Sequence, residues 1–368
     1  MSALSLVGLV LYMVSWSNTM ATNAHTDTGT GTETELDAET SAWCNYIRTT
    51  PEPTVIAYNR IGKCGSSTME RIIDRQVNTS RQYEHDLHAW HTDSSFWTQP
   101  GKHPQQQITS KQHQELLREH VLRTVDEAKQ GPGTRLIVDG HWNLVDLASG
   151  HLRDGSPPTA VQYIQLSRSC EPRIKSHLLY HLHDSVAAQH AKRTGHYRNF
   201  IGTAMGIPGG TVQMKRCLSN YSCLADMPIA REVLYDGAVL DYFCDADCVR
   251  AHRFESRLTG AMQRVRSPKD GGYAVVGVLE ELNQFLELLE CAFPGAFQGA
   301  AMANVLTPIH SNNSTVHSSD GSNAALDRFA HGTCITESHL YDQILTTAAR
   351  RHKAMKAHPE RCCRPRIA

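Results

Sequence analysis

Residues 54–76, TVIAYNRIGKCGSSTMERIIDRQ, predict a strand, a tight turn and a helix in direct succession. The stretch opens with a short apolar run rich in β-branched residues, which is typical of a buried strand. Gly62 and Gly65 bracket Lys63, and glycine lets a backbone turn sharply and approach a ligand closely. Residues 66–68 are Ser, Ser and Thr, which favour a helix start. Helix N–H groups, a lysine and hydroxyls around one turn indicate a phosphate or sulfate site.

The order of residues in this turn differs from that of the nucleotide P-loop. In GxxxxGK[ST] the lysine follows the glycine, whereas here Lys63 precedes Gly65. A turn rich in glycine and serine that binds nothing is therefore an open alternative. Arg60, just before the turn, and the features further along the chain favour the anion site.

Charge limits the partners that the chain attracts. With a net charge of −1 over 368 residues, no overall field draws nucleic acid to it, so an anionic partner must be held by a local patch. Neither HExxH nor a paired CxxC occurs, so no metal site is predicted. The basic C-terminal segment predicts a solvated end, with polyanion binding as the alternative. Its arginines are Arg350, Arg351, Arg361, Arg364 and Arg366.

The N-terminal segment predicts targeting. Residues 3–16 are uncharged and apolar, as in a signal peptide or short signal anchor, and a buried helix is the alternative. Residues 18–42 are polar and resemble a flexible stem. We therefore expect a targeting segment over 1–17, a stem over 18–42 and one globular domain over 43–368.

The cysteines and glycosylation sequons also favour the secretory route. The pairs Cys217/Cys223 and Cys244/Cys248 suit small disulfide loops, although buried free thiols would fit as well. The total of 11 cysteines is odd, so at least one is free or bonds another chain. Asn-X-Ser/Thr triplets begin at Asn78, Asn220, Asn312 and Asn313.

Further strands and helices alternate along the chain. Apolar runs predict strands at 136–139, 161–166 and 273–278. Helical patterns follow, at 173–183, 280–292 and 338–356. This alternation predicts an α/β fold with a mainly parallel sheet.

Two of these strands end in candidate site residues. His141 follows the strand at 136–139, at the edge where parallel α/β sheets place their chemistry. Arg168 follows the strand at 161–166, and Ser176 lies near enough along the next helix to share its ligand.

Several segments, in the same order, resemble the uronyl 2-O-sulfotransferases, which act on heparan and dermatan/chondroitin sulfate. The resembling segments are the Tyr58–Ser67 loop, GHWNLVD at 140–146, Arg168 with Ser176, the two cysteine pairs, and 276–300. The resemblance covers about residues 54–300 and extends more weakly into the last helix. It implies a P-loop-like sulfotransferase fold and a type II Golgi membrane protein, with a secreted protein as the alternative. It also implies 3′-phosphoadenosine 5′-phosphosulfate (PAPS) as sulfate donor.

The resemblance assigns roles to particular residues. Lys63, Cys64, Gly65, Ser66 and Ser67 would hold the 5′-phosphosulfate. The 3′-phosphate would lie on Arg168 and Ser176. His141 would be the base, and Arg60 would act on the sulfuryl group or on the acceptor's charge. The two cysteine pairs would form the family's small disulfide loops.

The chain also departs from the family. The heparan enzyme carries a second histidine two positions before the base, and Asp139 stands there in this chain. The family's basic loop after the long helix is replaced by a neutral segment at 307–323. We therefore expect a PAPS-dependent O-sulfotransferase that acts on a glycan hydroxyl, with the 2-hydroxyl of a uronic acid or a similar sugar as the expected acceptor. A P-loop-type small-molecule kinase and an inactive carbohydrate-binding relative remain alternatives, and a homo-oligomer is compatible with the sequence.

Overall fold

The chain divides into two units, Met1–Asp37 and Ala38–Ala368, in a computed structural model. The structure describes residues 36–61, 64–80, 82–86, 118–119, 123, 135–140, 144, 161–182, 239–244, 254–306, 331 and 334–365. The second unit opens with helix α2 (Ala38–Thr49), so the folded part begins inside the segment expected to be a stem. Thr40 and Trp43 are buried on this helix, which explains why it belongs to the fold.

A five-stranded sheet forms the centre of the second unit, in the order β2-β3-β1-β4-β5. Every pairing in it is parallel. The strands are β1 (Val55–Asn59), β2 (Tyr83–Asp86), β3 (Arg135–Gly140), β4 (Val161–Ser167) and β5 (Tyr273–Val278). The predicted α/β class with a parallel sheet is confirmed. Because β1 is central and buried along its whole length, the segment after it emerges between two neighbouring strands.

One face of the sheet packs against α13 (Leu240–Phe243), α15 (Phe254–Arg266) and α20 (Ile335–Ala357). Val55 and Ala57 of β1 lie in the same apolar cluster as Phe243 of α13 and Ile344 of α20. These β1 residues alternate with Ile56 and Tyr58, as expected where successive strand side chains point to opposite faces.

The other face is covered by α3 (Ser66–Ser80) and α16 (Leu282–Ala292), with α17 (Pro294–Phe297) and α18 (Ala300–Leu306) in contact with both. Gly277 of β5 belongs to this face. A Cβ at this glycine would lie 2.7 Å from Cβ of Phe285, so a side chain there would push α16 away. Glycine thus allows the close approach of helix to strand.

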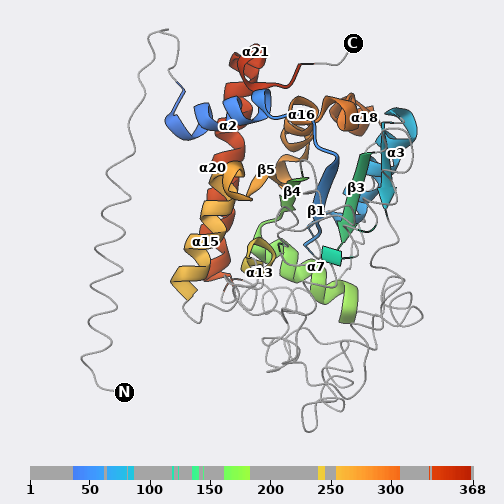
Figure 1. The fold of residues 1–368 in the computed structure, drawn as a ribbon. Coiled ribbons are helices and arrows are strands. Elements are labelled where there is room, and N and C mark those ends of the chain that lie inside the picture. Colours follow the sequence, from blue (N-terminus) through green and yellow to red (C-terminus); the bar gives the residue numbers. More distant parts are fainter. Residues whose placement is uncertain are drawn as a thin grey trace, which may run out of the picture. The chain divides into compact units, whose positions relative to one another are not determined.

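The amino ends of the strands carry a cluster that we call the base clamp, made of Trp43, Arg351, Arg364 and the disulfides Cys44–Cys362 and Cys291–Cys363. The neighbouring cysteines lie at the end of α21 (Pro359–Cys362), and each joins a different helix. Figure 1 shows α2 and α21 at this end of the sheet and α7 (Cys170–Leu182) at the other end. The C-terminal segment is thereby tied to the first and the middle parts of the unit.

The two arginines of the base clamp cap helices. Arg364 donates to the carbonyl oxygens of Thr50, 3.0 Å away at the end of α2, and of Ala292, the last residue of α16. Nη2 of Arg351 lies 2.9 Å from the carbonyl oxygen of Val265 near the end of α15. A cation is favourable at a helix C-terminus, where carbonyl groups lack partners within the helix. The prediction of a solvated basic end is therefore wrong for Arg351 and Arg364, which are 1% and 7% exposed.

Two predicted helices begin at other residues than expected. Helix α7 begins at Cys170, a few residues earlier than predicted, and α16 begins at Leu282 after a 3-10 turn, η2 (Leu279–Glu281). Helix α15 and strand β2 were not predicted. Within the described part of the chain no helix is both apolar and long enough to cross a membrane, and residues 3–16 lie outside that part.

Candidate functional site

The turn after β1 leads directly into helix α3, at the carboxyl edge of the sheet, by which we mean the carboxyl ends of β1, β3, β4 and β5. Gly65 has a φ of 77°, a left-handed conformation that favours glycine. Its carbonyl oxygen accepts from the N–H groups of Thr68 (3.0 Å) and Met69 (2.9 Å), so Gly65 occupies the cap position of α3. A Cβ on Gly65 would lie 2.6 Å from Cδ1 of Leu279, which lies just beyond β5. The tight turn therefore presents the start of α3 beside the ends of the neighbouring strands.

The start of α3 has the charge that an anion site requires. The first turn of the helix contains no acidic residue, and Ser67 is exposed there. The N–H groups of a first helical turn have no acceptors further back in the helix, and the helix dipole favours a negative charge near them. The backbone of Ser66 opens the helix, and Lys63 lies outside the described residues.

Cys64 precedes Gly65 in this turn, and its backbone N–H donates to the carbonyl oxygen of Ile61 at 3.2 Å. Its side chain is fully buried and is a free thiol, in the apolar cluster that contains Ala57. Burial raises the pKa of this thiol to about 12, and the positive charge of Arg173 acts in the opposite direction. A protonated, enclosed thiol is neither a nucleophile nor a ligand for an anion.

Arg60 lies between two carboxylates at the carboxyl edge. Its Nη1 lies 2.9 Å from Oδ2 of Asp139, and its Nη2 lies 3.2 Å from Oε2 of Glu70 on α3. The Arg60 and Asp139 side chains are 5% and 1% exposed, so this is a buried ion pair. The Arg60 N–H also donates to the carbonyl oxygen of Gly140 at 2.6 Å. The chain after β1 is thus fixed to the end of β3 immediately before His141, which itself lies outside the described residues.

Arg60 therefore has most of its charge offset within the protein. The sequence predicts that Arg60 acts on the sulfuryl group or the acceptor, and the observed pairs give it in addition a role in holding β3 and α3 together. Asp139 stands where the heparan enzyme has its additional histidine, and its carboxylate makes the ion pair with Arg60. The pairing of Asp139 with Arg60 was not predicted from the sequence.

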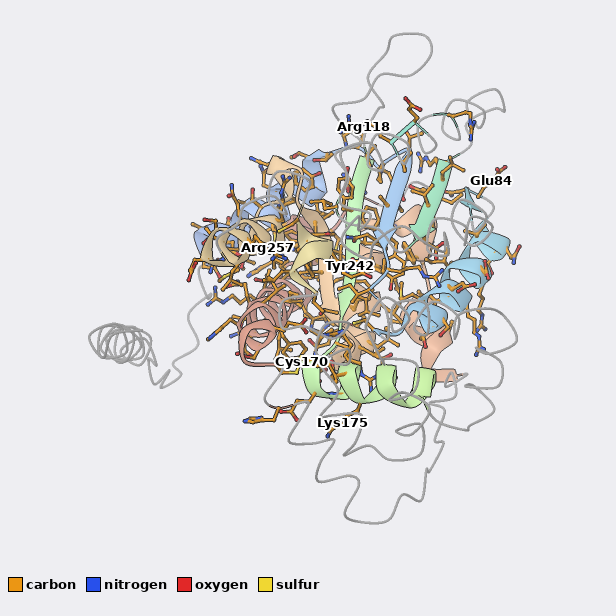
Figure 2. The ribbon with its side chains drawn as sticks, turned by 90° about the horizontal axis from the view of Figure 1, so that it is seen from below. Glu84, Arg118, Cys170, Lys175, Tyr242 and Arg257 are labelled. Carbon is orange, nitrogen blue, oxygen red and sulfur yellow. A yellow bond between two sulfur atoms is a disulfide. The ribbon has the colours of Figure 1, made fainter. Side chains whose placement is uncertain are left out.

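Arg168 and Ser176 lie on the segment that follows β4, the neighbour of β1. Arg168 follows the last residue of this strand and is partly buried, and Ser176 lies partly buried on α7. Arg168 is near enough to Cys64 for its charge to lower the pKa of that thiol. Arg168 follows the end of β4, the neighbour of β1, and therefore lies at the same edge as the glycine turn. Figure 2 shows α7 with Cys170 at its start and Lys175 on its outer side.

A second set of buried contacts, which the sequence did not indicate, holds α7 in place. Nη2 of Arg173 on α7 lies 2.7 Å from Oε2 of Glu337 on α20, with both side chains below 10% exposed. The disulfide Cys170–Cys334 joins the start of α7 to the residue before α20. Oε1 of Glu337 also accepts from the N–H of Val239 at 3.0 Å. The start of α20 is thus a support for the segment that carries Arg168.

Two amide side chains lie buried under this edge. Nδ2 of Asn59 donates to the carbonyl oxygen of Tyr242 at 2.6 Å and to the hydroxyl of Tyr273 at 2.9 Å. Gln165 on β4 is fully buried, and within the described residues neither polar atom of its side chain has a hydrogen-bond partner. A buried polar group without a hydrogen-bond partner costs free energy.

The described cysteines form the disulfides Cys44–Cys362, Cys170–Cys334 and Cys291–Cys363, and Cys64 is free. Cys244 is also disulfide-bonded, to a cysteine outside the described residues. The predicted partner, Cys248, and the predicted pair Cys217/Cys223 lie outside as well.

No group of His, Cys, Asp and Glu suited to a metal ion occurs among the described residues. Comparison with known protein families and with characterised proteins found no match for this chain.

Proposed function

We propose that this protein is a PAPS-dependent O-sulfotransferase that transfers a sulfuryl group to a glycan hydroxyl. The observation that carries the proposal is the turn at Gly65, which delivers the non-acidic start of α3 to the carboxyl end of the central strand. Arg168, at the end of the adjacent strand, supplies a cation at the same edge. In open α/β sheets ligands bind outside the carboxyl ends of the strands, where connections leave in opposite directions. A donor with a phosphosulfate at one end and a 3′-phosphate at the other suits two such anion-binding positions.

The proposed roles come from the resemblance to the uronyl 2-O-sulfotransferases, and Lys63 and His141 lie outside the described residues. Lys63 and the backbone from Cys64 to Ser67 hold the 5′-phosphosulfate, and Arg168 with Ser176 holds the 3′-phosphate. His141 is the base. Arg60, fixed by Asp139 and Glu70, presents a partly neutralised guanidinium near the transferred group. In this proposal the thiol of Cys64 has no chemical role, because it is buried and protonated.

The proposed reaction is an in-line displacement at sulfur. The acceptor hydroxyl oxygen forms a bond to sulfur while the bond from sulfur to the 5′-phosphate oxygen of PAPS breaks. The hydroxyl proton moves to His141, and 3′,5′-adenosine bisphosphate leaves. Charge spreads over the sulfuryl oxygens, where fixed N–H groups and cations stabilise it, as in phosphoryl transfer. Histidine has a pKa near neutrality, which suits the base.

The disulfides support a place in the secretory pathway. Such bonds persist in oxidising compartments, and Cys44–Cys362 and Cys291–Cys363 close the base clamp. We therefore propose the Golgi lumen, with residues 1–17 as the anchor of a type II membrane protein, and a secreted form as the alternative. The acceptor in this compartment is a glycan, with the 2-hydroxyl of a uronic acid or a similar sugar as the first candidate.

The kinase alternative has less support. An Mg²⁺-dependent phosphotransferase needs a carboxylate for its metal, and one candidate at this edge is Asp139, the residue before the last of β3. Asp139 is 1% exposed on its side chain and is engaged with Arg60. The inactive carbohydrate-binding alternative is distinguished from an enzyme by activity alone.

The test is a sulfate-transfer assay with radiolabelled PAPS over a panel of desulfated glycosaminoglycans and other polysaccharides. We expect label in at least one polysaccharide, and the change His141→Ala to abolish it while binding of 3′,5′-adenosine bisphosphate stays within about twofold. Binding of the nucleotide without transfer to any acceptor would identify the inactive relative. Thermal stabilisation by ATP-Mg²⁺ and none by 3′,5′-adenosine bisphosphate would identify the kinase.

A further inference from the structure

Glu280 joins separate elements at the carboxyl edge. It lies in η2, the 3-10 turn that follows β5. Its Oε1 accepts from the N–H of Ser169 at 3.1 Å and from the hydroxyl of Ser169 at 2.7 Å. Its Oε2 accepts from the hydroxyl of Tyr341 on α20 at 3.3 Å. One carboxylate therefore connects the end of β5, the segment between β4 and α7, and helix α20.

The bonds to Ser169 determine the course of the chain beside Arg168. The carbonyl oxygen of Ser169 accepts from the N–H of Arg173 at 3.2 Å, which makes Ser169 the capping residue of α7. A capping serine ordinarily turns its hydroxyl to an N–H group of the first helical turn. Here the hydroxyl and the N–H of Ser169 both point to Glu280. On the other side of Arg168, Ser167 pairs with Val278 of β5.

The position of α7 as a whole has separate anchors. The buried pair of Arg173 with Glu337 and the disulfide Cys170–Cys334 join α7 to α20 without involving Glu280. We therefore expect loss of the Glu280 carboxylate to change the segment at Arg168 and to leave the helix in place. This separation makes the effect of Glu280 on a ligand measurable apart from its effect on folding.

Direct contact between Glu280 and an anionic ligand is unfavourable, because like charges repel. Glu280 can therefore favour an anion site only through the groups that it orients. We propose that Glu280 is a positioning residue that directs the Arg168 side chain toward the 3′-phosphate of the donor nucleotide. This inference rests on the proposed function and deepens it, since it assigns the discrimination for the 3′-phosphate to a residue that does not touch the ligand.

The test compares Glu280→Ala with Glu281→Ala. Glu281 lies next to Glu280 in the same turn, is exposed, and contacts the side chain of Gln284 at 2.8 Å. Calorimetric titration gives the affinity of each variant for 3′,5′-adenosine bisphosphate and for adenosine 5′-phosphosulfate, which lacks the 3′-phosphate. We expect Glu280→Ala to lower the affinity for the bisphosphate about tenfold and the affinity for the phosphosulfate less than about twofold. Glu281→Ala should change neither affinity.

The outcomes separate the inference from the proposed function. A wild-type protein that binds neither nucleotide contradicts the proposed function. Suppose that the wild type binds both nucleotides. The role of Glu280 is overturned if Glu280→Ala binds both with the affinities of the wild type. It is also overturned if Glu280→Ala loses affinity equally for the two nucleotides. Should Glu280→Ala fail to fold, Ser169→Ala removes the shorter hydrogen bond alone, and a selective loss of about threefold for the bisphosphate is then expected.

Discussion

The most deeply buried arginines at the two ends of the sheet are held in different ways. In the base clamp, Arg351 and Arg364 donate to backbone carbonyl oxygens at the ends of helices. At the carboxyl edge, Arg60 and Arg173 pair with the carboxylates of Asp139 and Glu337. The first arrangement satisfies groups that every helix leaves unpaired. The second places opposite charges side by side in the interior, which ordinarily gains little stability over an apolar core.

This difference distinguishes structural from functional use of the same side chain. The last carbonyl oxygens of a helix need hydrogen-bond donors, and a buried arginine can donate to several of them where helix C-termini lie close together. The carboxylate pairs join elements that are far apart in the sequence, β1 to β3 through Arg60 and α7 to α20 through Arg173. We infer that the base clamp stabilises the fold and that the pairs at the carboxyl edge mainly fix the site. The predictions below test this division.

The largest expected effect comes from removing the Cys44–Cys362 disulfide of the base clamp. The bond closes a segment with a sequence separation of 318, and its loss in Cys44→Ala/Cys362→Ala should lower the free energy of unfolding by about 2–5 kcal/mol. Denaturant unfolding measures the change. Affinity for 3′,5′-adenosine bisphosphate should remain within about twofold, because the clamp lies at the far end of the strands.

The matched control for this variant is the loss of Cys170–Cys334 at the carboxyl edge, with a sequence separation of 164. Chain entropy differs little between the two loops, so the losses of stability should be similar. Of the two variants, only the one that lacks Cys170–Cys334 should bind the nucleotide more weakly. Equal effects of the two variants on nucleotide binding would contradict the division between the two ends.

The second prediction concerns the buried pair at the carboxyl edge. Asp139→Asn leaves Arg60 with only its Glu70 carboxylate from this network, and we expect a loss of about 3 kcal/mol in the free energy of unfolding. Glu70→Gln is the control, since the Glu70 side chain is 29% exposed and such pairs contribute about 0–1 kcal/mol. Denaturant unfolding gives both values, and losses of equal size would show that burial of Asp139 has no special effect.

The parts of the fold that follow from local pattern were predictable. The apolar runs predicted β1, β3, β4 and β5, and their alternation with helices predicted a parallel sheet. The turn at Gly65 was predictable as well, because few residues other than glycine allow such a turn. Strand β2 was missed because Tyr83–Asp86, YEHD, carries no apolar run.

The pairings of the arginines were not predictable from one sequence. Arg351 and Arg364 stand in a basic segment that reads as solvated, and their burial depends on helix ends brought together by the tertiary fold. Arg60 and Asp139 are far apart in the sequence and meet only because β1 and β3 are neighbours. Local composition carries no signal for either arrangement.

The third prediction concerns alkaline pH and Cys64. Burial raises the pKa of Cys64 from 9.0 to about 12, so the folded protein keeps a proton that the unfolded chain releases. Its contribution to stability is therefore complete below pH 9 and is lost as the pH rises toward 12. Buried tyrosines with raised pKa values also lose stability at alkaline pH, so between pH 7 and pH 10 the wild type should lose about 1.4 kcal/mol more than Cys64→Ala. Unfolding curves at pH 7 and 10 measure this, with non-reducing electrophoresis to exclude disulfide exchange.

The smallest expected effect comes from a surface cluster beside the base clamp. Oε2 of Glu287 on α16 lies 2.6 Å from Nε2 of His352 and 2.6 Å from Nζ of Lys356, both on α20. Burial acts to raise the pKa of Glu287, and the hydrogen bonds from Lys356 and His352 outweigh it, so the pKa is lowered. The contribution to stability is therefore present above the ordinary value of 4.5 and is lost as the pH falls below it.

Because these groups are partly exposed, Glu287→Gln should cost less than about 1 kcal/mol at pH 7 and nothing below the folded pKa of Glu287. Melting temperatures of the wild type and the variant at pH 7 and pH 3 measure the difference, with Glu290→Gln as a control on the same helix. A larger cost at pH 7 would mean that the base clamp depends on ion pairs as the carboxyl edge does. The distinction between carbonyl-capped and carboxylate-paired arginines would then no longer separate the two ends of the sheet.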